Sequence, residues 1–387
     1  MDPGFIQTRK EEYIGILKEL IRQKTVNPPG DEYLAAAIVQ KRLSQLHVPF
    51  TTHEKEKGRT NTIARIGTKT DSNKAVLFSA HLDVVPAGEG WDTDPFEPTI
   101  KPEQPNIMYG RGTIDNKGQA TAILLIAEYL KSIEPQLKNQ FIFVWAADEE
   151  HGSKQGIKYL FEQKLLDADL AIVPDVSGAL ELIDVAEKGV LDMVVTSHGK
   201  QAHGSRPQLG INAIGNMSRF ICAIEKHVLA HSPHRFLSAP TMNVGTISGG
   251  SAANTVPARC EMVINIRTLP GMTSEAIVEE LSSLSQGLGK FDFDVKYHIP
   301  PTEVDPDNVL VKTIQEVGKR HGLDVKLHGL TGATDTKTFN LNGIPAIGYD
   351  FADIDLAHNA NEYVNLDNLF RYVELMSEVC LELDRKI

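Results

Sequence analysis

Three adjacent acidic residues follow an apolar, strand-like run in the middle of the chain. The run FIFVWAA covers residues 141–147, and Asp148, Glu149 and Glu150 come directly after it. Neighbouring carboxylates repel one another, and each loses favourable hydration when it is buried. A positively charged partner is therefore expected where this run ends.

Other polar residues follow the remaining strand-like runs in the same way. They are His81 and Asp83 after AVLFSA, Asp175 after LAIVP, His358 a short loop after PAIGYD, and Asp115 within the glycine-rich stretch GRGTIDNKGQ. Functional sites of open parallel sheets form beyond the carboxyl ends of the strands, so these side chains are expected to meet. Imidazole and carboxylate groups are ligands for zinc, manganese or cobalt. Two such ions, roughly 3.5–4 Å apart, would need a bridging carboxylate and would neutralise the clustered acids.

The elements that must position these residues alternate between strands and helices. Helices are predicted over 5–23, from Glu32, over 119–133, over 306–321, near 334–341 and in the closing run LDNLFRYVELMSEVCLEL, with strands at AVLFSA, FIFVWAA, LAIV and PAIGYD. Such alternation predicts an α/β fold, with a mostly parallel sheet and helices on both faces.

A separate pattern interrupts this one at residues 184–298. Its expected elements are, in order, the strand VLDMVVTS, the helix GINAIGNMSRFICAIEKHVL, the strands TMNVGTIS and ARCEMVINIRT, the helix SEAIVEELSSLSQGL and the strand FDFDVKYH. The order β-α-β-β-α-β is the ferredoxin-like arrangement of an α+β domain. We therefore predict one α/β domain, residues 1–183 and 299–387, interrupted by an inserted domain at 184–298.

Composition excludes several classes of protein. The 387 residues carry a net charge of −12, which disfavours nucleic acid or an anionic membrane surface as the main partner. No apolar run approaches the length of about 18 residues that spans a bilayer, and the first residues lack the apolar core of a secretion signal. The three cysteines, Cys222, Cys260 and Cys380, are too few and too far apart for a disulfide framework. We expect all three to be buried in a cytoplasmic protein.

Five ordered blocks resemble the signatures of one metal-dependent family. They are HLDVVP at 81–86, YGRGTIDNKG at 109–118, ADEEHGS at 147–153, PD at 174–175 and AHNANEYV at 357–364. They are similar to those of the peptidase/deacylase family of aminoacylase-1, succinyl-diaminopimelate desuccinylase, acetylornithine deacetylase and glutamate carboxypeptidase. The resemblance covers nearly the whole chain, and it implies a zinc-peptidase-like catalytic domain with an inserted lid and dimerisation domain.

The resemblance also assigns roles to single residues. It implies that His81 and Asp175 bind a first metal, that Glu150 and His358 bind a second, and that Asp115 bridges the two, with Glu149 as general base and Asp83 orienting His81. The family often has Glu where this chain has Asp175. It typically has a cis peptide bond after the bridging aspartate, which here would join Asp115 to Asn116.

The implied reaction is hydrolysis of an amide next to a free carboxylate. A hydroxide bridging two divalent ions, with zinc expected and cobalt or manganese as alternatives, would attack the carbonyl, and Glu149 would shuttle the proton. The substrate favoured is an N-acyl amino acid such as succinyl-diaminopimelate, while an aminoacylase, a metallo-carboxypeptidase or a dipeptidase remains an alternative. A non-catalytic scaffold is the alternative of another class, but it would be expected to have lost some of the six residues that bind metal or act as base.

Further residues are predicted to bind substrate. The resemblance makes His203, in HGKQAHGSRP, a catalytic residue that reaches the active site of the other subunit of a homodimer formed through the inserted domain. It makes Asn254, Arg267 and Thr334 candidate substrate contacts. Plainer interpretations are a loop histidine for His203, a turn residue for Asn254 and a surface ion pair for Arg267. An anionic acyl chain could be neutralised by basic residues, namely Arg111, Arg206, Arg267 and Lys337, and a purely structural role is the alternative for Arg111.

Overall fold

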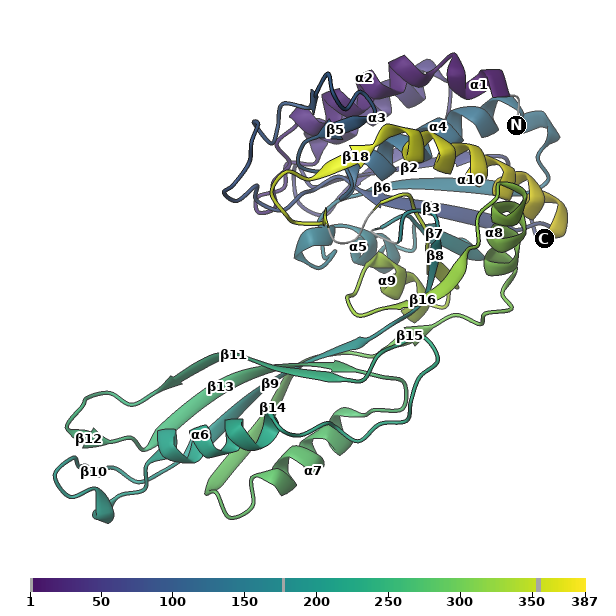
Figure 1. Cartoon of the computed structure of the whole chain (residues 1–387). Coiled ribbons are helices and arrows are strands. Elements are labelled where there is room, and N and C mark those ends of the chain that lie inside the picture. Colours follow the sequence, from purple (N-terminus) through teal and green to yellow (C-terminus); the bar gives the residue numbers. More distant parts are fainter. Residues whose placement is uncertain (1–2, 176–177, 353–355) are drawn as a thin grey trace. The chain divides into compact units, whose positions relative to one another are not determined.

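The computed structural model describes residues 3–175, 178–352 and 356–387, which form two compact units (Figure 1). The first unit comprises Met1–Val185, Val304–His328 and Thr334–Ile387, and the second comprises Ala186–Glu303 and Gly329–Ala333. The sequence placed the divisions at 183/184 and 298/299 and assigned residues 329–333 to the first domain.

A mixed sheet of nine strands has its central strands in the first unit, while Thr302–Glu303 at one edge belongs to the second. From edge to edge the strands are β1 (Phe50–Glu54), β2 (Thr60–Ile66), β6 (Gln140–Ala146), β3 (Ala75–His81), β7 (Leu170–Val173), β17 (Ala346–Gly348), β8 (Leu182–Glu187) and β15 (Thr302–Glu303), with β16 (Lys326–Leu330) also paired to β8. The four central strands, β6, β3, β7 and β17, are parallel, and the strands on both sides of them are antiparallel. The predicted α/β fold is confirmed, with more antiparallel pairing at the edges than the sequence suggested.

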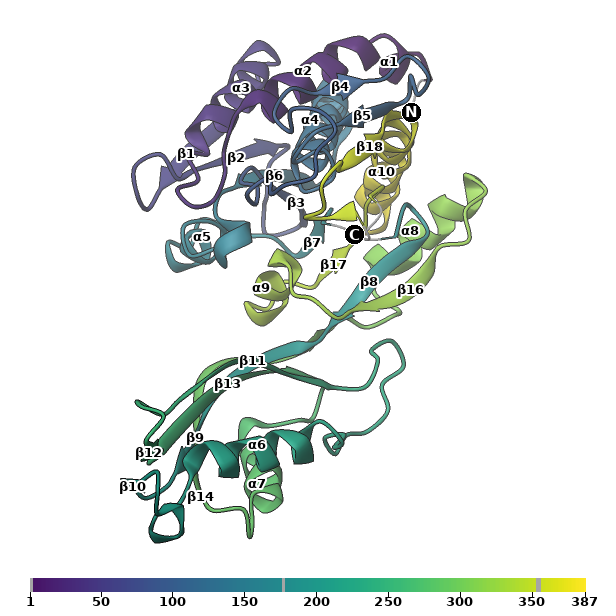
Figure 2. The same ribbon diagram turned by 60° about the vertical axis from the view of Figure 1, so that its left-hand side comes forward.

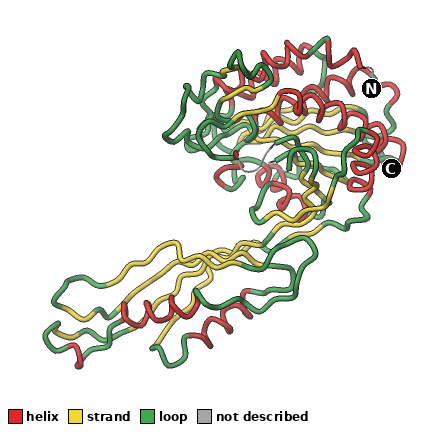
Figure 3. The backbone as a smooth tube through the Cα atoms, viewed as in Figure 1, coloured by secondary structure: helices red, strands yellow, loops and turns green. Residues whose placement is uncertain are grey.

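Helices cover both faces of this sheet (Figures 2 and 3). On one face lie α2 (Lys10–Arg22), α3 (Tyr33–Gln45), α4 (Lys117–Ser132) and α10 (Leu366–Lys386), and on the other lie α5 (Ile157–Glu162) and α9 (Asp335–Leu341). Helix α8 (Val309–Arg320) packs against α10. The helix expected over 5–23 is instead split into α1 (Pro3–Gln7) and α2. Because both faces are covered, β3 and β6 are buried at every position, as their continuous apolar runs predict.

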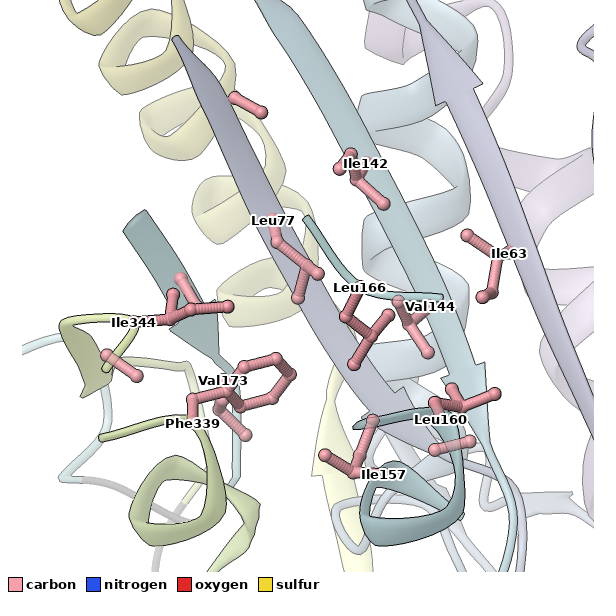
Figure 4. Close-up of a cluster of buried hydrophobic side chains, with 14 residues drawn as sticks. Ile63, Leu77, Ile142, Val144, Ile157, Leu160, Leu166, Val173, Phe339 and Ile344 are labelled. Carbon is pink, nitrogen blue, oxygen red and sulfur yellow. The ribbon is translucent and has the colours of Figure 1, made fainter. Parts of the chain in front are cut away.

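The core beneath α5 and α9 fixes the carboxyl ends of the central strands. Leu77, Ile142 and Val144 of the sheet pack against Ile157 of α5 and Phe339 of α9 (Figure 4). Burying each large apolar side chain stabilises the fold by roughly 1.5–3 kcal/mol. The strand ends are therefore held rigidly, which suits a site that depends on fixed side-chain positions.

A small three-stranded sheet lies beside the main one. It consists of β4 (Thr99–Ile100), β5 (Ile107–Tyr109) and β18 (Tyr363–Asn365), in the order β18-β5-β4. Strand β5 leads to Asp115, and β18 follows His358 along the chain. Pairing of these two strands ties the segment that carries Asp115 to the segment that carries His358.

The second unit contains a four-stranded antiparallel sheet and two helices. In chain order its main elements are β9 (Gly189–His198), α6 (Ala213–Ile224), β11 (Thr241–Gly249), β13 (Arg259–Thr268), α7 (Ser274–Leu284) and β14 (Lys290–Ile299). The strands lie in the order β11-β13-β9-β14, which is the ferredoxin-like topology. Both helices pack on one face, where Phe220, Met262 and Leu281 belong to a shared core. The helix expected over 210–229 is shorter, and it begins after the cap Asn212.

A two-stranded ribbon extends from the second unit. It pairs β10 (Ala202–His203) with β12 (Thr255–Val256). Cys260 and Cys380 are buried as expected, but Cys222 on α6 is exposed, so the prediction was wrong for that cysteine. In the described part of the chain, no helix combines the length and the apolarity that crossing a bilayer requires.

Candidate metal centre

The central parallel strands deliver their terminal residues to one edge of the sheet. His81 is the last residue of β3 and is paired in register with Ala146, the last residue of β6. Asp148, Glu149 and Glu150 follow β6, and Asp175 follows β7 after one proline. Because parallel strands end at the same edge, their terminal residues meet there.

Two groups of potential metal ligands form at this edge. The first contains His81, Asp115 and Asp175, and the second contains Asp115, Glu150 and His358. Within each group, the ligand atoms all lie within 4.8 Å of one another. No other group of potential metal ligands occurs among the described residues. His227, His231 and His234, which are close together in the sequence, therefore do not form a ligand group.

Asp115 belongs to both groups and presents one oxygen to each histidine. Its Oδ1 lies 3.0 Å from His81 Nε2, and its Oδ2 lies 3.1 Å from His358 Nε2. His81 Nε2 is also 4.0 Å from Asp175 Oδ1, and His358 Nε2 is 3.1 Å from Glu150 Oε2. This is the arrangement of a carboxylate that bridges two ions.

The electrostatics of the cluster fit divalent cations. Glu150 Oε1 is buried and has no hydrogen-bond partner among the described residues, so one oxygen of this ligand carboxylate is unsatisfied. Burial raises the pKa of Asp175 well above its ordinary value, and the nearby Asp115 raises it further. Burial, followed by repulsion from Asp115, also raises the pKa of Glu150. A metal ion would relieve both effects, because it supplies positive charge and accepts the free lone pairs.

The two histidines are held as if protonated. Hydrogen bonds to Asp115 and Glu150 raise the pKa of His358 to about 10. Burial alone would lower the pKa of His81, but hydrogen bonds to Asp115 and Asp83 raise it well above 6.5. Each proton occupies the ring nitrogen whose lone pair would bind a metal, so protons and metal ions compete for these positions.

Glu149 differs from its neighbours because its carboxylate accepts no hydrogen bond from any described residue. Burial raises its pKa well above the ordinary value, and repulsion from Asp175 adds to the effect. A carboxylate with a raised pKa beside the ligand groups is suited to taking and returning a proton. The expected role of general base is consistent with this position.

Asp83 contacts two parts of the site. His81 Nδ1 lies 3.0 Å from the backbone carbonyl oxygen of Asp83 and 3.4 Å from its Oδ1. The carboxylate also accepts hydrogen bonds from the backbone amides of Glu149 and Glu150, both at 3.1 Å. Asp83 can therefore orient His81, as the family resemblance implies, and it also holds the acidic loop, which the sequence did not suggest.

Asn116 links three ligand-bearing segments, and the sequence reasoning missed it. Its side-chain oxygen accepts a hydrogen bond from the amide of His81 at 3.2 Å, and its Nδ2 donates to Pro174 O at 2.8 Å and Asp175 Oδ1 at 3.3 Å. The Asp115–Asn116 peptide bond is cis, as the resemblance implies. A polar residue after the bridging aspartate was the only signal that could have suggested this role.

Arg111 and Lys337 are not available to an acyl chain as the sequence proposed. Their side chains are only 1% and 2% exposed. Arg111 pairs with the buried Glu362 at 2.6 Å and donates to the carbonyl oxygen of His358 at 3.3 Å. Glu362 in turn accepts a hydrogen bond from the amide of Ile114 at 2.9 Å. The ion pair therefore ties together the segments that carry Asp115 and His358.

The segment GATDTK, residues 332–337, includes the start of α9. Thr334 was the expected substrate contact, and its side chain caps α9 by accepting a hydrogen bond from the amide of Thr336 at 3.1 Å. The adjacent Asp335 is buried and accepts a hydrogen bond from Ser153, in the loop after Glu150. Burial raises the pKa of Asp335 to about 6. Asp335 lies next to Thr334 in the same segment, and the sequence prediction did not include it.

The remaining predicted residues lie in the second unit. His203 and Asn254 are exposed on the β10–β12 ribbon, where the amide of Gly204 donates to Asn254 O at 2.6 Å. Arg267 lies near the far end of β13, eight residues beyond Arg259, which is about 26 Å along a strand. The structure thus brings His203 and Asn254 together, but it does not place Arg267 with them.

The fold and the paired ligand groups define a hydrolase of the two-metal class, and comparison with known proteins agrees. The model of peptidase family M20/M25/M40 matches residues 77–382. Acetylornithine deacetylase of Pectobacterium carotovorum is 31% identical, covering 82% of each chain, and a probable succinyl-diaminopimelate desuccinylase of Staphylococcus epidermidis is 26% identical, covering 96% of this chain and 97% of the relative. The crystal structure of aminopeptidase PepT from Bacillus cereus superposes with a TM-score of 0.77 at 22% identity, covering 97% of this chain and 98% of the other.

The chain therefore belongs to peptidase family M20/M25/M40. It is a metal-dependent hydrolase that acts on C–N amide bonds, so the resemblance found in the sequence is confirmed and the scaffold alternative is not supported. The identities do not favour the desuccinylase over the acetylornithine deacetylase.

Proposed function

We propose that this enzyme is a di-metal N-acyl-amino-acid deacylase that hydrolyses an amide next to a free carboxylate. The observation that carries the proposal is the shared Asp115, whose two oxygens face His81 and His358. His81, Asp115 and Asp175 would hold one ion, and Asp115, Glu150 and His358 would hold the other. Zinc is the proposed metal, and cobalt and manganese suit the same ligands.

The residues around the ions would divide the chemistry between them. When bound, two divalent ions supply an activated water and polarise the substrate carbonyl. Glu149 takes a proton as the amide is attacked and returns it to the leaving nitrogen. His81 and His358 must lose their own protons before ions bind, because the same nitrogens serve both. His203 would donate a hydrogen bond to the oxyanion of the tetrahedral intermediate.

The substrate class follows from the basic residues that remain available. Arg111 and Lys337 are buried, so the candidates for binding negative charge are Arg206, which is exposed, and Arg267, which is half-buried on β13. Arg267 would bind the free carboxylate, and Arg206 a second anionic group such as a succinyl chain. Relatives named as a desuccinylase and a deacetylase support a deacylase, and an aminoacylase, a dipeptidase or a carboxypeptidase is the alternative.

A homodimer formed through the second unit is part of the proposal. Edge strand β14 carries Lys290, Asp292, Asp294 and Lys296, and such charges oppose edge pairing, whereas edge strand β11 has no charged residue. Beside β11, a hollow of about 550 Å³ is lined by both apolar and polar residues, among them Ile214, Val256 and Ser251. A second copy, pairing β11 with β11, would satisfy the free backbone groups and fill this hollow.

The dimer would also complete the active site. Within one chain, His203 and Arg267 are associated with opposite ends of β13, about 26 Å apart along the strand, which is too far for one small substrate. We therefore assign His203 to the active site of the other subunit. The three unpaired cysteines support the cytoplasm as its location.

Hydrolysis of a substrate panel tests the proposal. Chelated enzyme, with zinc, cobalt or manganese restored, would be given N-succinyl-diaminopimelate, N-acetylornithine, several N-acetyl amino acids and several dipeptides. Metal-dependent cleavage of an N-acyl amino acid is the expected result. Cleavage of dipeptides alone would replace the deacylase with a dipeptidase, and the absence of metal binding would refute the metal centre.

A further inference from the structure

The loop that carries Glu149 is held by its backbone. Three successive amides each donate a hydrogen bond to a buried carboxylate: Asp148 N to Glu32 Oε1, Glu149 N to Asp83 Oδ1 and Glu150 N to Asp83 Oδ2, all at 3.1 Å. Because the Glu149 carboxylate accepts no hydrogen bond from a described residue, its position depends on this backbone. The residues that hold Glu32, Asp83 and Asp148 therefore determine where Glu149 lies.

Asn27 joins two of these carboxylates. Its Nδ2 donates to Asp83 Oδ2 at 2.8 Å and to Asp148 Oδ1 at 3.0 Å, so each of its two protons is used. The backbone of Asn27 is also held in place, because its amide donates to Val84 O at 2.9 Å and Val26 forms a β-bridge with Val84. A neutral amide between two buried acids reduces their repulsion without adding a charge.

Arg59 supplies the positive charge. Its Nε lies 2.7 Å from Glu32 Oε2, and its terminal nitrogen lies 2.7 Å from Glu32 Oε1 and 2.9 Å from Asp148 Oδ1. Among the described residues it is the only lysine or arginine that pairs with Glu32, Asp83 or Asp148. The planar fork bridges two carboxylates at fixed spacing, which an ammonium group cannot do.

We propose that Asn27, supported by Arg59, is a positioning residue for the general base. This inference rests on the proposed function, in which Glu149 carries the proton. Asn27 and Arg59 hold the carboxylates of Asp83, Asp148 and Glu32. The carboxylates of Glu32 and Asp83 accept the hydrogen bonds from the amides of residues 148–150. The carboxylate of Glu149 is thereby left free for proton transfer, although its backbone is fixed. A displacement of about 1 Å at such a group can cost about 10²-fold in rate.

The test compares Asn27→Ala with Asn139→Ala. Asn139 is another buried asparagine, with hydrogen bonds to Asp384 and Ile387, outside the site described above. In saturating zinc, Asn27→Ala should lower kcat about ten- to a hundredfold with little change in KM. Hydrogen exchange in peptides covering 147–153 should become faster, without substrate present. Asn139→Ala should lower the melting temperature but change neither kcat nor this exchange.

Arg59→Lys provides a second variant if Asn27→Ala folds poorly. It keeps the positive charge but lacks the planar guanidinium that contacts both Glu32 and Asp148. Arg59→Lys should accelerate hydrogen exchange over 147–153, and it should lower kcat by less than Asn27→Ala does. Exchange and kcat indistinguishable from Asn139→Ala would overturn the inference, and so would loss of zinc with unchanged exchange. Faster exchange in a chain that hydrolyses no tested amide would support the positioning role and refute the proposed function instead.

Discussion

At the scale of single residues, one aspartate determines whether two ions can be held together. Asp115 faces His81 with one oxygen and His358 with the other, whereas Asp175 belongs to the first group alone. Asp115→Asn should therefore weaken both positions, and Asp175→Asn should weaken one. Metal content after dialysis against limiting zinc is expected to fall below one ion per chain for Asp115→Asn and to stay near one for Asp175→Asn. An equal loss of zinc in the two variants would show that Asp115 does not serve both metal positions.

Glu149 should be separable from the metal ligands. Glu149→Gln keeps the shape of the side chain but cannot accept a proton, so kcat should fall by about 10²–10⁴ while zinc content is retained. Glu162→Gln, at an exposed carboxylate paired with Lys55, is the matched control and should leave kcat unchanged. Retained activity in Glu149→Gln would remove Glu149 as the base.

The raised pKa values predict how the metal-free protein responds to pH. The folded pKa of His358 is about 10, above its ordinary 6.5, and burial raises the pKa of Asp175 well above its usual range. Groups with raised folded pKa values stabilise the fold at low pH and lose that contribution as the pH rises through the folded value. The melting temperature of chelated protein, relative to that of a chelated His358→Ala chain, should therefore fall between about pH 6.5 and about pH 10. The comparison removes the opposing effect of the buried Lys117, whose pKa burial lowers to about 7. The melting temperature of zinc-loaded protein should fall less over this pH range, since bound ions replace the protons. The same dependence of melting temperature on pH with and without zinc would contradict this account.

The metal ligands could be predicted from the sequence, but the residues that surround and hold them could not. Histidines and acids after strand ends could be selected because the fold places such positions at one edge. Asn27, Asn116 and Asp335 could not, since a polar residue in a turn looks the same whether it faces solvent or a buried carboxylate. Arg111 could be either a substrate contact or a structural residue from the sequence alone, because its buried partner Glu362 lies 251 residues away in the sequence.

At the scale of elements, the central strands were predictable and the edges of the sheet were not. AVLFSA, FIFVWAA and LAIV are continuous apolar runs because helices cover both of their faces. Strands β1 and β8, with the sequences FTTHE and LIDVAE, carry polar residues at intervals and were missed. Strand β8 pairs with β15, β16 and β17, which are distant in the chain, and no local pattern reveals such pairing. Strand β1 pairs with the next strand, β2, but its polar residues gave no apolar run to recognise.

The start of α4 offers a test of how tightly an element positions the site. A Cβ on Gly118 would lie 2.2 Å from the carbonyl oxygen of Thr113, just before Asp115, whereas one on Gly15 of α2 would meet nothing within 4 Å. Gly118→Ala should cost about 1–3 kcal/mol of stability and reduce zinc binding, because the Asp115 segment must shift. Gly15→Ala should stabilise by about 0.5–1 kcal/mol. Denaturant unfolding and zinc titration would measure both, and unaltered zinc affinity in Gly118→Ala would count against tight positioning.

At the scale of the whole molecule, the uncharged edge strand predicts the assembly. Ile247 on β11 is 52% exposed and Tyr297 on β14 is 45% exposed, so each can be changed to lysine without disturbing a core. Light scattering should give a dimer for the parent chain and for Tyr297→Lys, and a monomer of 42.6 kDa for Ile247→Lys. A monomer mass for both the parent chain and Ile247→Lys would contradict pairing through β11, and so would a dimer mass for Ile247→Lys.

Complementation follows from the same assembly. A His203→Ala chain mixed with a Glu149→Gln chain should recover part of the activity, because one site of the mixed dimer would have an intact base and an intact His203. No recovery after verified subunit exchange would place His203 in the active site of its own chain.

The separation of His203 and Arg267 along β13 has a consequence for how much enzyme a cell must make. If each active site uses His203 of the other subunit, an isolated chain is inactive however well it folds. Activity then rises with the square of the protein concentration as long as most chains are monomers. Dilution would then switch the enzyme off without any inhibitor, and a small change in synthesis would produce a larger change in turnover. Abundance itself would act as a control on this hydrolase.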